Sequence, residues 1–230
     1  MARPDAPSSS AFLALADVDY NEDAWERDVD GWTIAFSLRR SDNAIRDKQN
    51  NLFQDDDNDV CREQDELELE DWPLFPTDYY ERTSSNLITI SRHKRNDCQS
   101  STLYGFCLFY GNYINSNENT EKIKFVVTVE KICTAVNSFK GTGKFMLALL
   151  TKYAHARKHE IEVDGAKLVI SQPLDEAKPF YEKLGFEECD GIDEMDMFLY
   201  DESDGVHFAP LEEMRGTKRR RSDRLMLLVG

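Results

Sequence analysis

The stretch "SFKGTGKFMLALL", residues 138–150, decides how the fold of this chain is interpreted. It places Gly141 and Gly143 among lysines and then changes to apolar residues at helical spacing. Glycines at a helix start let backbone amides approach a ligand, and the helix end adds a partial positive charge. This combination is typical of a loop that holds a phosphate group. The alternative is a simple turn before a core helix.

The residues around the lysine argue against a nucleoside-triphosphate loop, although a nucleotide-binding protein remains a third alternative. That loop has the pattern G-x-x-x-x-G-K-[ST], in which the last hydroxyl binds magnesium. Here Phe145 follows Lys144, and Ser138 stands where the first glycine would be. Two interpretations of the loop remain: a cradle that holds a pyrophosphate without a metal ion, with Lys140 and Lys144 adding Coulomb attraction, and the simple turn before a core helix.

Apolar and β-branched runs on both sides of this loop predict an α/β fold. Two of the runs before the loop are joined by an Asn-rich turn, which favours antiparallel neighbours. A helix, a strand, a second helix and a last strand follow the loop. The predicted strands are residues 31–40, 86–94, 102–114, 122–136, 166–173 and 193–200, and the predicted helices are 41–53, 143–161 and 174–186.

The composition is that of a globular chain with an acidic surface. Its 230 residues, 40% of them hydrophobic, suffice for one large domain with tails. The net charge of −16 argues against generic nucleic-acid binding and is compatible with a basic acceptor or partner. No segment approaches the roughly 20 apolar residues that span a membrane, and the N-terminus is a poor signal peptide, so we expect an intracellular protein.

Changes in composition divide the chain into segments. We expect a flexible leader at residues 1–30, a single domain at 31–200, and a C-terminal tail at 201–230. An acidic insert interrupts the domain at about residues 54–85.

The two charged segments each have more than one interpretation. Residues 55–71 hold ten acidic residues and one arginine, and they form either a solvated insert or an acidic docking surface. In the tail, a basic cluster runs from Lys218 to Arg221. It is either a nuclear-import signal or a cationic segment that pairs with the insert, so the location is cytoplasmic or nuclear.

The cysteines show no metal-binding or disulfide pattern. No C-x-x-C pair exists, and an odd count without a signal peptide favours reduced, buried thiols. The five are Cys61, Cys98, Cys107, Cys133 and Cys189.

Two motifs in the second half of the chain resemble the GNAT N-acetyltransferase superfamily. The pattern Q/R-x-x-G-x-G/A corresponds to Ser138-Phe139-Lys140-Gly141-Thr142-Gly143. A segment like A-x-x-x-Y-x-K-x-G-F corresponds to Ala177-Lys178-Pro179-Phe180-Tyr181-Glu182-Lys183-Leu184-Gly185-Phe186. The resemblance covers about residues 86–200, and more weakly 31–53. Ser138 departs from the usual Gln or Arg, although Lys140 keeps a cation beside the first glycine.

The resemblance implies acetyl-CoA as the co-substrate and assigns residues to it. The pyrophosphate would be held by the amides of Lys140, Gly141, Thr142, Gly143 and Lys144. The pantetheine arm would pair with the end of the fourth strand of the family fold, residues 132–136, which includes Cys133 and Thr134. A backbone N–H at that strand end would polarise the thioester carbonyl.

The resemblance also implies the proton transfers. Tyr181 stands at the family's general-acid position, and a tyrosine with a reference pKa of about 10 stays protonated at neutral pH and can donate to the leaving thiolate. Glu130 is our candidate base for the amine, although it could equally be an exposed strand carboxylate, with a water-relayed base instead. His155 and His159 are expected on the helix surface. Cys133 is expected to be a buried residue rather than a nucleophile, because the family transfers the acetyl group directly.

The sequence therefore predicts an α/β fold with a GNAT-like, mixed and mostly antiparallel central sheet flanked by helices. The expected activity is acetyl transfer from acetyl-CoA to the amine of a basic acceptor: a protein lysine, a protein N-terminus or a polyamine. The alternative is a module on the same fold that binds acyl-CoA or a protein without catalysis. We expect no metal, no membrane and no nucleic acid among its partners.

Overall fold

The computed structural model describes residues 15, 18–41, 44–54, 86–94, 97–115, 123–160, 165–189 and 194–199. Residues 55–85 of the predicted acidic insert and the whole predicted tail at 201–230 lie outside the described residues. The predictions made for them, including the basic cluster, stay predictions.

Within the described residues, eight strands form one sheet in the order β1-β2-β3-β4-β5-β6-β8-β7. The β5–β6 pair is parallel, and the pairs β1–β2, β2–β3, β6–β8 and β7–β8 are antiparallel. The described pairs confirm the predicted mixed and mostly antiparallel sheet. The strands are β1 (Ala24–Val29), β2 (Trp32–Ser37), β3 (Asn86–Lys94), β4 (Asp97–Asn115), β5 (Ile123–Thr134), β6 (Gly165–Ser171), β7 (Glu187–Glu188) and β8 (Glu194–Leu199), and the helices are α2 (Ala44–Gln54), α5 (Thr142–Glu160) and α6 (Lys178–Lys183).

The chain divides into two compact units. The first comprises Met1–Val18, Glu22–Leu108 and Ile132–Met146, and the second comprises Asp19–Asn21, Phe109–Lys131 and Leu147–Gly230. The contacts within each unit are described separately below.

The first unit begins with the β1–β2 hairpin. Asp30 and Gly31 turn the chain with φ values of 52° and 77°, and Val29 pairs with Trp32 directly across the turn. An Asp-Gly pair suits this two-residue turn because both positions need positive φ. The strand β1 lies inside residues 1–30, so the predicted flexible leader is wrong over this part.

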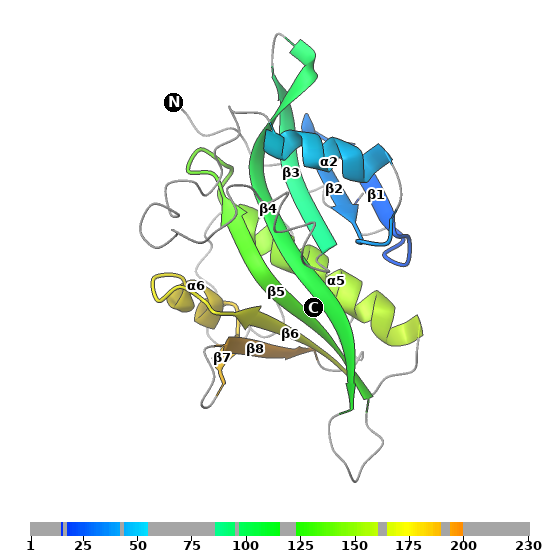
Figure 1. Cartoon of the computed structure of the whole chain (residues 1–230). Helices are drawn as coiled ribbons and strands as arrows, with labels where there is room; N and C mark the ends of the chain where they lie inside the picture. The colour runs from blue at the N-terminus through cyan, green and yellow to red at the C-terminus, as the bar shows by residue number, and fades with distance from the viewer. Residues whose placement is uncertain are drawn as a thin grey trace. The chain divides into compact units, whose positions relative to one another are not determined.

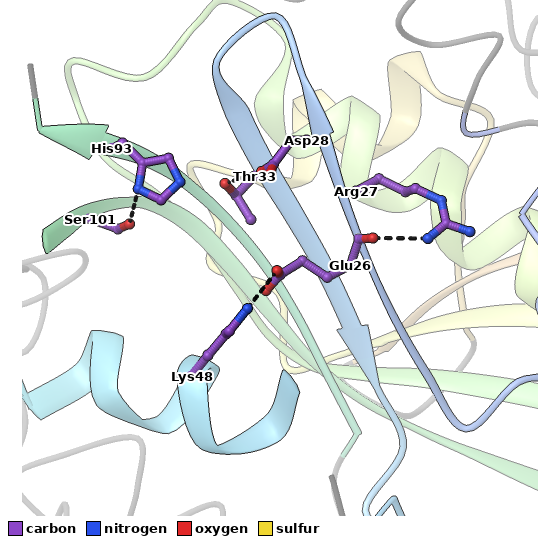
Figure 2. Close-up of polar contacts among 7 residues, drawn as sticks. All are labelled: Glu26, Arg27, Asp28, Thr33, Lys48, His93 and Ser101. Atoms are coloured by element: carbon purple, nitrogen blue, oxygen red, sulfur yellow. Dashed lines mark hydrogen bonds and ion pairs between the residues drawn. The ribbon is translucent and has the colours of Figure 1, made fainter. Parts of the chain in front are cut away.

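The helix α2 is fixed to the sheet of the first unit by Gln49. This buried side chain donates to the backbone oxygen of Ala35 at 3.1 Å and to Oγ1 of Thr89 at 3.1 Å, and it accepts from Ser37 Oγ at 2.5 Å. At the surface, Lys48 of α2 forms an ion pair with Glu26 of β1 at 2.9 Å (Figure 2). Figure 1 shows α2 lying beside β1, β2 and β3.

The second unit contains the parallel β5–β6 pair with α5 as its crossover (Figure 1). Phe109 and Phe125 each contact the ring of Tyr153 on α5, with ring centroids 5.5 and 5.8 Å apart. The aromatic rings pack α5 against its own unit's strands and so hold the helix that follows the glycine loop.

Several element boundaries differ from those predicted from the sequence. The helix α6 has only six residues, because Pro179 lies in its first turn and cannot occupy a helix interior. The short strand β7 was not predicted. Among the helices of the described residues, none is long and apolar enough to cross a membrane.

Candidate functional site

The predicted phosphate loop connects β5 to α5 in the first unit. The Ser138 N–H donates to the Ala135 backbone oxygen at 3.0 Å and closes a turn after the strand. Gly141 has a φ of 98°, which side-chain-bearing residues rarely adopt. The Phe145 N–H then donates to the Gly141 oxygen at 2.9 Å, and α5 begins at Thr142. The strand, glycine turn and helix therefore follow the order that the sequence predicted.

Two amides at the start of α5 are available to a ligand. The Thr142 N–H is directed to the Phe139 oxygen at 3.4 Å. The N–H groups of Gly143 and Lys144 have no hydrogen-bond partner within the part of the chain that the structure describes. Both residues are partly exposed, and Lys140 is exposed beside them. Two open amides at the start of a 19-residue helix, together with two lysines, are the groups that the predicted anion cradle requires, and the cradle itself stays a prediction.

The hydroxyl groups of the loop point inward rather than towards a ligand. Thr142 Oγ1 donates to the Phe139 oxygen at 2.7 Å and lies 2.5 Å from Ser138 Oγ. Both side chains are buried. Of the five cradle residues named from the sequence, Thr142 is therefore an internal brace, and its side chain does not face the cradle.

Aromatic packing seats the loop on the sheet of the first unit. The buried ring of Phe139 meets Trp32 of β2 edge-on, with centroids 5.0 Å apart. Trp32 in turn meets Tyr104 of β4 at 5.0 Å, and the Arg92 guanidinium lies 5.1 Å from the Trp32 ring centroid. No sequence signal pointed to Trp32 and Phe139, because they come from segments more than a hundred residues apart.

The end of β5 is paired along one edge in the part of the chain that the structure describes. The Ala135 N–H donates to the Tyr104 oxygen at 2.9 Å, which ties this end to β4. The register of β5 with β6 ends at Val129 and Ile170, whereas β5 continues to Thr134. Because successive strand residues direct their N–H groups to opposite edges, the exposed Thr134 presents its N–H on the edge away from β4. This is the edge on which the resemblance places the pantetheine arm.

Cys133 precedes Thr134 and differs from expectation in its oxidation state. It is buried, as predicted, but it is disulfide-bonded, whereas Cys107 and Cys189 are free thiols. The prediction of reduced thiols is therefore wrong for Cys133, because pairing depends on chain positions that a scattered cysteine pattern does not show. A disulfide-bonded sulfur is no nucleophile. Burial and a hydrogen bond to Asp196 raise the pKa of Cys189 to about 11, so this thiol is not activated either.

Tyr181, the expected general acid, lies on α6 in the second unit. Its ring is buried and meets Phe180 and Phe186 edge-on, with centroids 5.2 and 5.8 Å apart. The N–H groups of Leu184 and Phe186 donate to its backbone oxygen, and Gly185 turns the chain with a φ of 96°. The motif around Tyr181 thus folds as a short helix closed by a left-handed glycine.

Glu130, the expected base, also lies in the second unit. It is half-buried on β5, one residue beyond the last residue paired with β6. The carboxyl ends of two parallel strands meet at one edge of a sheet, so Glu130 lies at the edge from which β6 continues towards α6. His155 is buried, which corrects its predicted surface position, and the side chain of His159 lies outside the described residues.

The structure groups the predicted residues by unit. The first unit brings together the cradle and the end of β5, whose residues are Cys133, Thr134, Lys140, Gly141, Thr142, Gly143 and Lys144. The second unit holds Glu130 and Tyr181. Sequence reasoning missed the role of Ser138, for which the only signal was its unusual residue type at that motif position.

Comparisons with known proteins gave structural neighbours only. No protein-family model and no curated protein matches the sequence. A tyrosine-to-phenylalanine mutant of the AtaT toxin is similar to the chain at 15% identity and a TM-score of 0.49, over 74% of this chain and 90% of that one. The same mutant toxin bound to the C-terminus of the antitoxin AtaR and acetyl-CoA is similar at 15% identity and a TM-score of 0.48, over 74% of this chain and 94% of that one. AtaT complexed with acetyl-methionyl-tRNAfMet is similar at 12% identity and a TM-score of 0.39, over 57% of this chain and 74% of that one.

Proposed function

We propose that the chain is an N-acetyltransferase that moves an acetyl group from acetyl-CoA directly to the amine of a basic acceptor. The observation that carries the proposal is the loop after β5. It ends in a long helix whose Gly143 and Lys144 amides are open, with no position for a magnesium-binding hydroxyl after Lys144. A metal-free pyrophosphate cradle of this kind, followed by a parallel strand and the Tyr181 motif, fits coenzyme A.

The first unit supplies the groups that would bind acetyl-CoA. The Gly143 and Lys144 amides donate to the pyrophosphate, and the ammonium groups of Lys140 and Lys144 add charge attraction. The amide-like pantetheine arm pairs with the open edge of β5. The Thr134 N–H on that edge donates to the thioester oxygen and stabilises the negative charge that develops there during attack.

Tyr181 and Glu130 are the groups that would move protons in this reaction. The amine nitrogen attacks the thioester carbonyl carbon, the C–S bond breaks, and the sulfur leaves as a thiolate. Tyr181 donates its phenolic proton to that thiolate and regains one from solvent. Glu130 takes the proton that the amine must lose, directly or through a water molecule. The products are an N-acetylated amine and coenzyme A with a free thiol.

The acidic surface favours a basic acceptor such as a protein lysine, a protein N-terminus or a polyamine. The experiment is release of free coenzyme A thiol during incubation with a panel of basic, neutral and acidic amines. We expect release with basic amines, and reaction of only neutral or acidic amines would contradict this choice. The panel includes an aminoacyl-tRNA, because one structural neighbour is AtaT complexed with acetyl-methionyl-tRNAfMet. Turnover with it would overturn our expectation that nucleic acid is excluded.

The competing function is a module that binds acyl-CoA or a protein without catalysis. It predicts saturable acetyl-CoA binding without thiol release for any amine in the panel. An acetyltransferase should show both saturable acetyl-CoA binding and thiol release. The same assay therefore separates the two.

A further inference from the structure

We infer that Ser138 and Thr142 form a hydroxyl clasp that positions the pyrophosphate cradle. This inference rests on the proposed function. It assigns a role to Ser138, which stands where the GNAT motif that this loop resembles has Gln or Arg. The two residues are positioning residues, because neither side chain faces the cradle.

The direction of the clasp follows from counting protons. Thr142 has one hydroxyl proton, and it is donated to the Phe139 oxygen at 2.7 Å. The Ser138 hydroxyl, 2.5 Å from Thr142 Oγ1, must therefore donate to Thr142. The chain of donation runs from Ser138 through Thr142 to the backbone of Phe139. It closes the segment that contains Lys140 and Gly141.

Burial makes this clasp hard to replace by water. Ser138 is 5% exposed and Thr142 is 2% exposed, so solvent does not compete for their hydroxyl groups. A buried hydroxyl that loses its partner costs free energy, which favours the closed loop. Phe139 is held from its other side by the ring of Trp32. The loop is thus fixed at its first residue, at its middle and at the start of α5.

The consequence for binding is preorganisation. The Gly143 and Lys144 amides follow Thr142 directly, so their direction depends on where the clasp holds that residue. Ordering the loop before the ligand arrives saves the free energy of ordering it on binding.

The test compares Thr142→Val, which removes the hydroxyl and keeps the shape, with Thr151→Val as a matched control. Thr151 is also buried on α5 and donates to a backbone oxygen, that of Leu147 at 3.0 Å, but it lies outside the loop. We expect Thr142→Val to raise the Kd for acetyl-CoA about tenfold, and Thr151→Val and the rescue variant Thr142→Ser to leave it within about twofold. The Kd for S-acetylpantetheine, which lacks the pyrophosphate, should not change in any variant.

Ser138→Ala is a second variant in case Thr142→Val folds poorly, because it removes one hydroxyl group and adds no atom. Combining Ser138→Ala with Thr142→Val should raise the Kd no further than Thr142→Val alone, because both break one clasp. Additive losses, an unchanged Kd in Thr142→Val, or an equal loss with S-acetylpantetheine would overturn the inference.

Amide exchange separates the clasp from the proposed function. The Phe145 N–H donates to the Gly141 oxygen and reports loop order without any ligand. Exchange of this amide should speed up in Thr142→Val and Ser138→Ala but not in Thr151→Val. If wild type does not bind acetyl-CoA, the proposed function fails, whereas unchanged Phe145 exchange in the variants contradicts the clasp itself.

Discussion

Gly105 of β4 lies against Thr142 at the start of α5, so closely that a Cβ atom at Gly105 would be 3.1 Å from Thr142 Cγ2. The same Cβ would be 3.1 Å from the backbone oxygen of Cys133, which cannot move aside as a flexible side-chain end could. Gly105→Ala should therefore destabilise the protein by about 1–3 kcal/mol and displace Thr142. We expect weaker acetyl-CoA binding, measured by calorimetry beside thermal unfolding.

Two other glycines serve as controls for Gly105→Ala. A Cβ at Gly165 meets nothing within 4 Å, so Gly165→Ala should leave both stability and Kd nearly unchanged. A Cβ at Gly111 would lie 2.6 Å from Phe125 Cζ, away from the loop. Gly111→Ala should lower stability without a selective loss of acetyl-CoA affinity in the folded protein. If Gly105→Ala and Gly111→Ala lose the same acetyl-CoA affinity for the same loss of stability, the Gly105 contact has no special role in the cradle.

The backbone of Gly141 gives a second prediction. Its φ of 98° is costly for a residue with a side chain, so Gly141→Ala should strain the loop by about 1–3 kcal/mol and disturb the cradle. Gly185 has nearly the same φ, 96°, but closes α6 instead. Both variants should lose similar stability in thermal unfolding, and only Gly141→Ala should raise the Kd for acetyl-CoA. A selective effect of Gly185→Ala on that Kd would be the contrary result.

Tyr181 gives the prediction for catalysis. Tyr181→Phe keeps the ring that packs against Phe180 and Phe186 and removes only the hydroxyl. Turnover should fall by about a hundredfold or more, because a positioned general acid typically contributes that much, while acetyl-CoA binding persists. Turnover is measured by thiol release under saturating acetyl-CoA, and acetyl-CoA binding is measured by calorimetry. Unchanged turnover would show that Tyr181 is only a packed aromatic residue.

The cysteines give a prediction that does not depend on function. Cys133 is disulfide-bonded, and one disulfide uses two of the five cysteines of the sequence. Protein purified without reductant and unfolded in denaturant should react with three equivalents of a thiol reagent, and with five after reduction. Five equivalents before reduction would contradict the disulfide and restore the expectation drawn from the sequence.

The glycine turn and the helix start after β5 could be predicted from the sequence because their signals are local. Glycines, a lysine and a change to helical spacing follow one another within residues 138–150, and the structure places a turn and the start of α5 there. The parallel strand β6 was also predictable, because a helix-length segment separates two apolar runs. The late start of α6 follows from Pro179, whose ring is tolerated only in the first turn.

The features that sequence reasoning missed depend on contacts between distant or alternating positions. The strand β1 is short and carries Glu26, Arg27 and Asp28, so it was included in the predicted flexible leader. His155 was placed on the surface because of neighbouring lysines. It is spaced by four from the buried Thr151, and that spacing puts both on one helix face. The inward direction of the Ser138 hydroxyl appears only when the loop is folded.

The most direct test of the central claim is calorimetric titration of the wild-type chain with acetyl-CoA in buffer without divalent metal. We predict saturable binding to one site, unaffected by chelator, and weakened when S-acetylpantetheine replaces acetyl-CoA, because the cradle then has no pyrophosphate to hold. Binding of magnesium–ATP with no binding of acetyl-CoA would contradict the account.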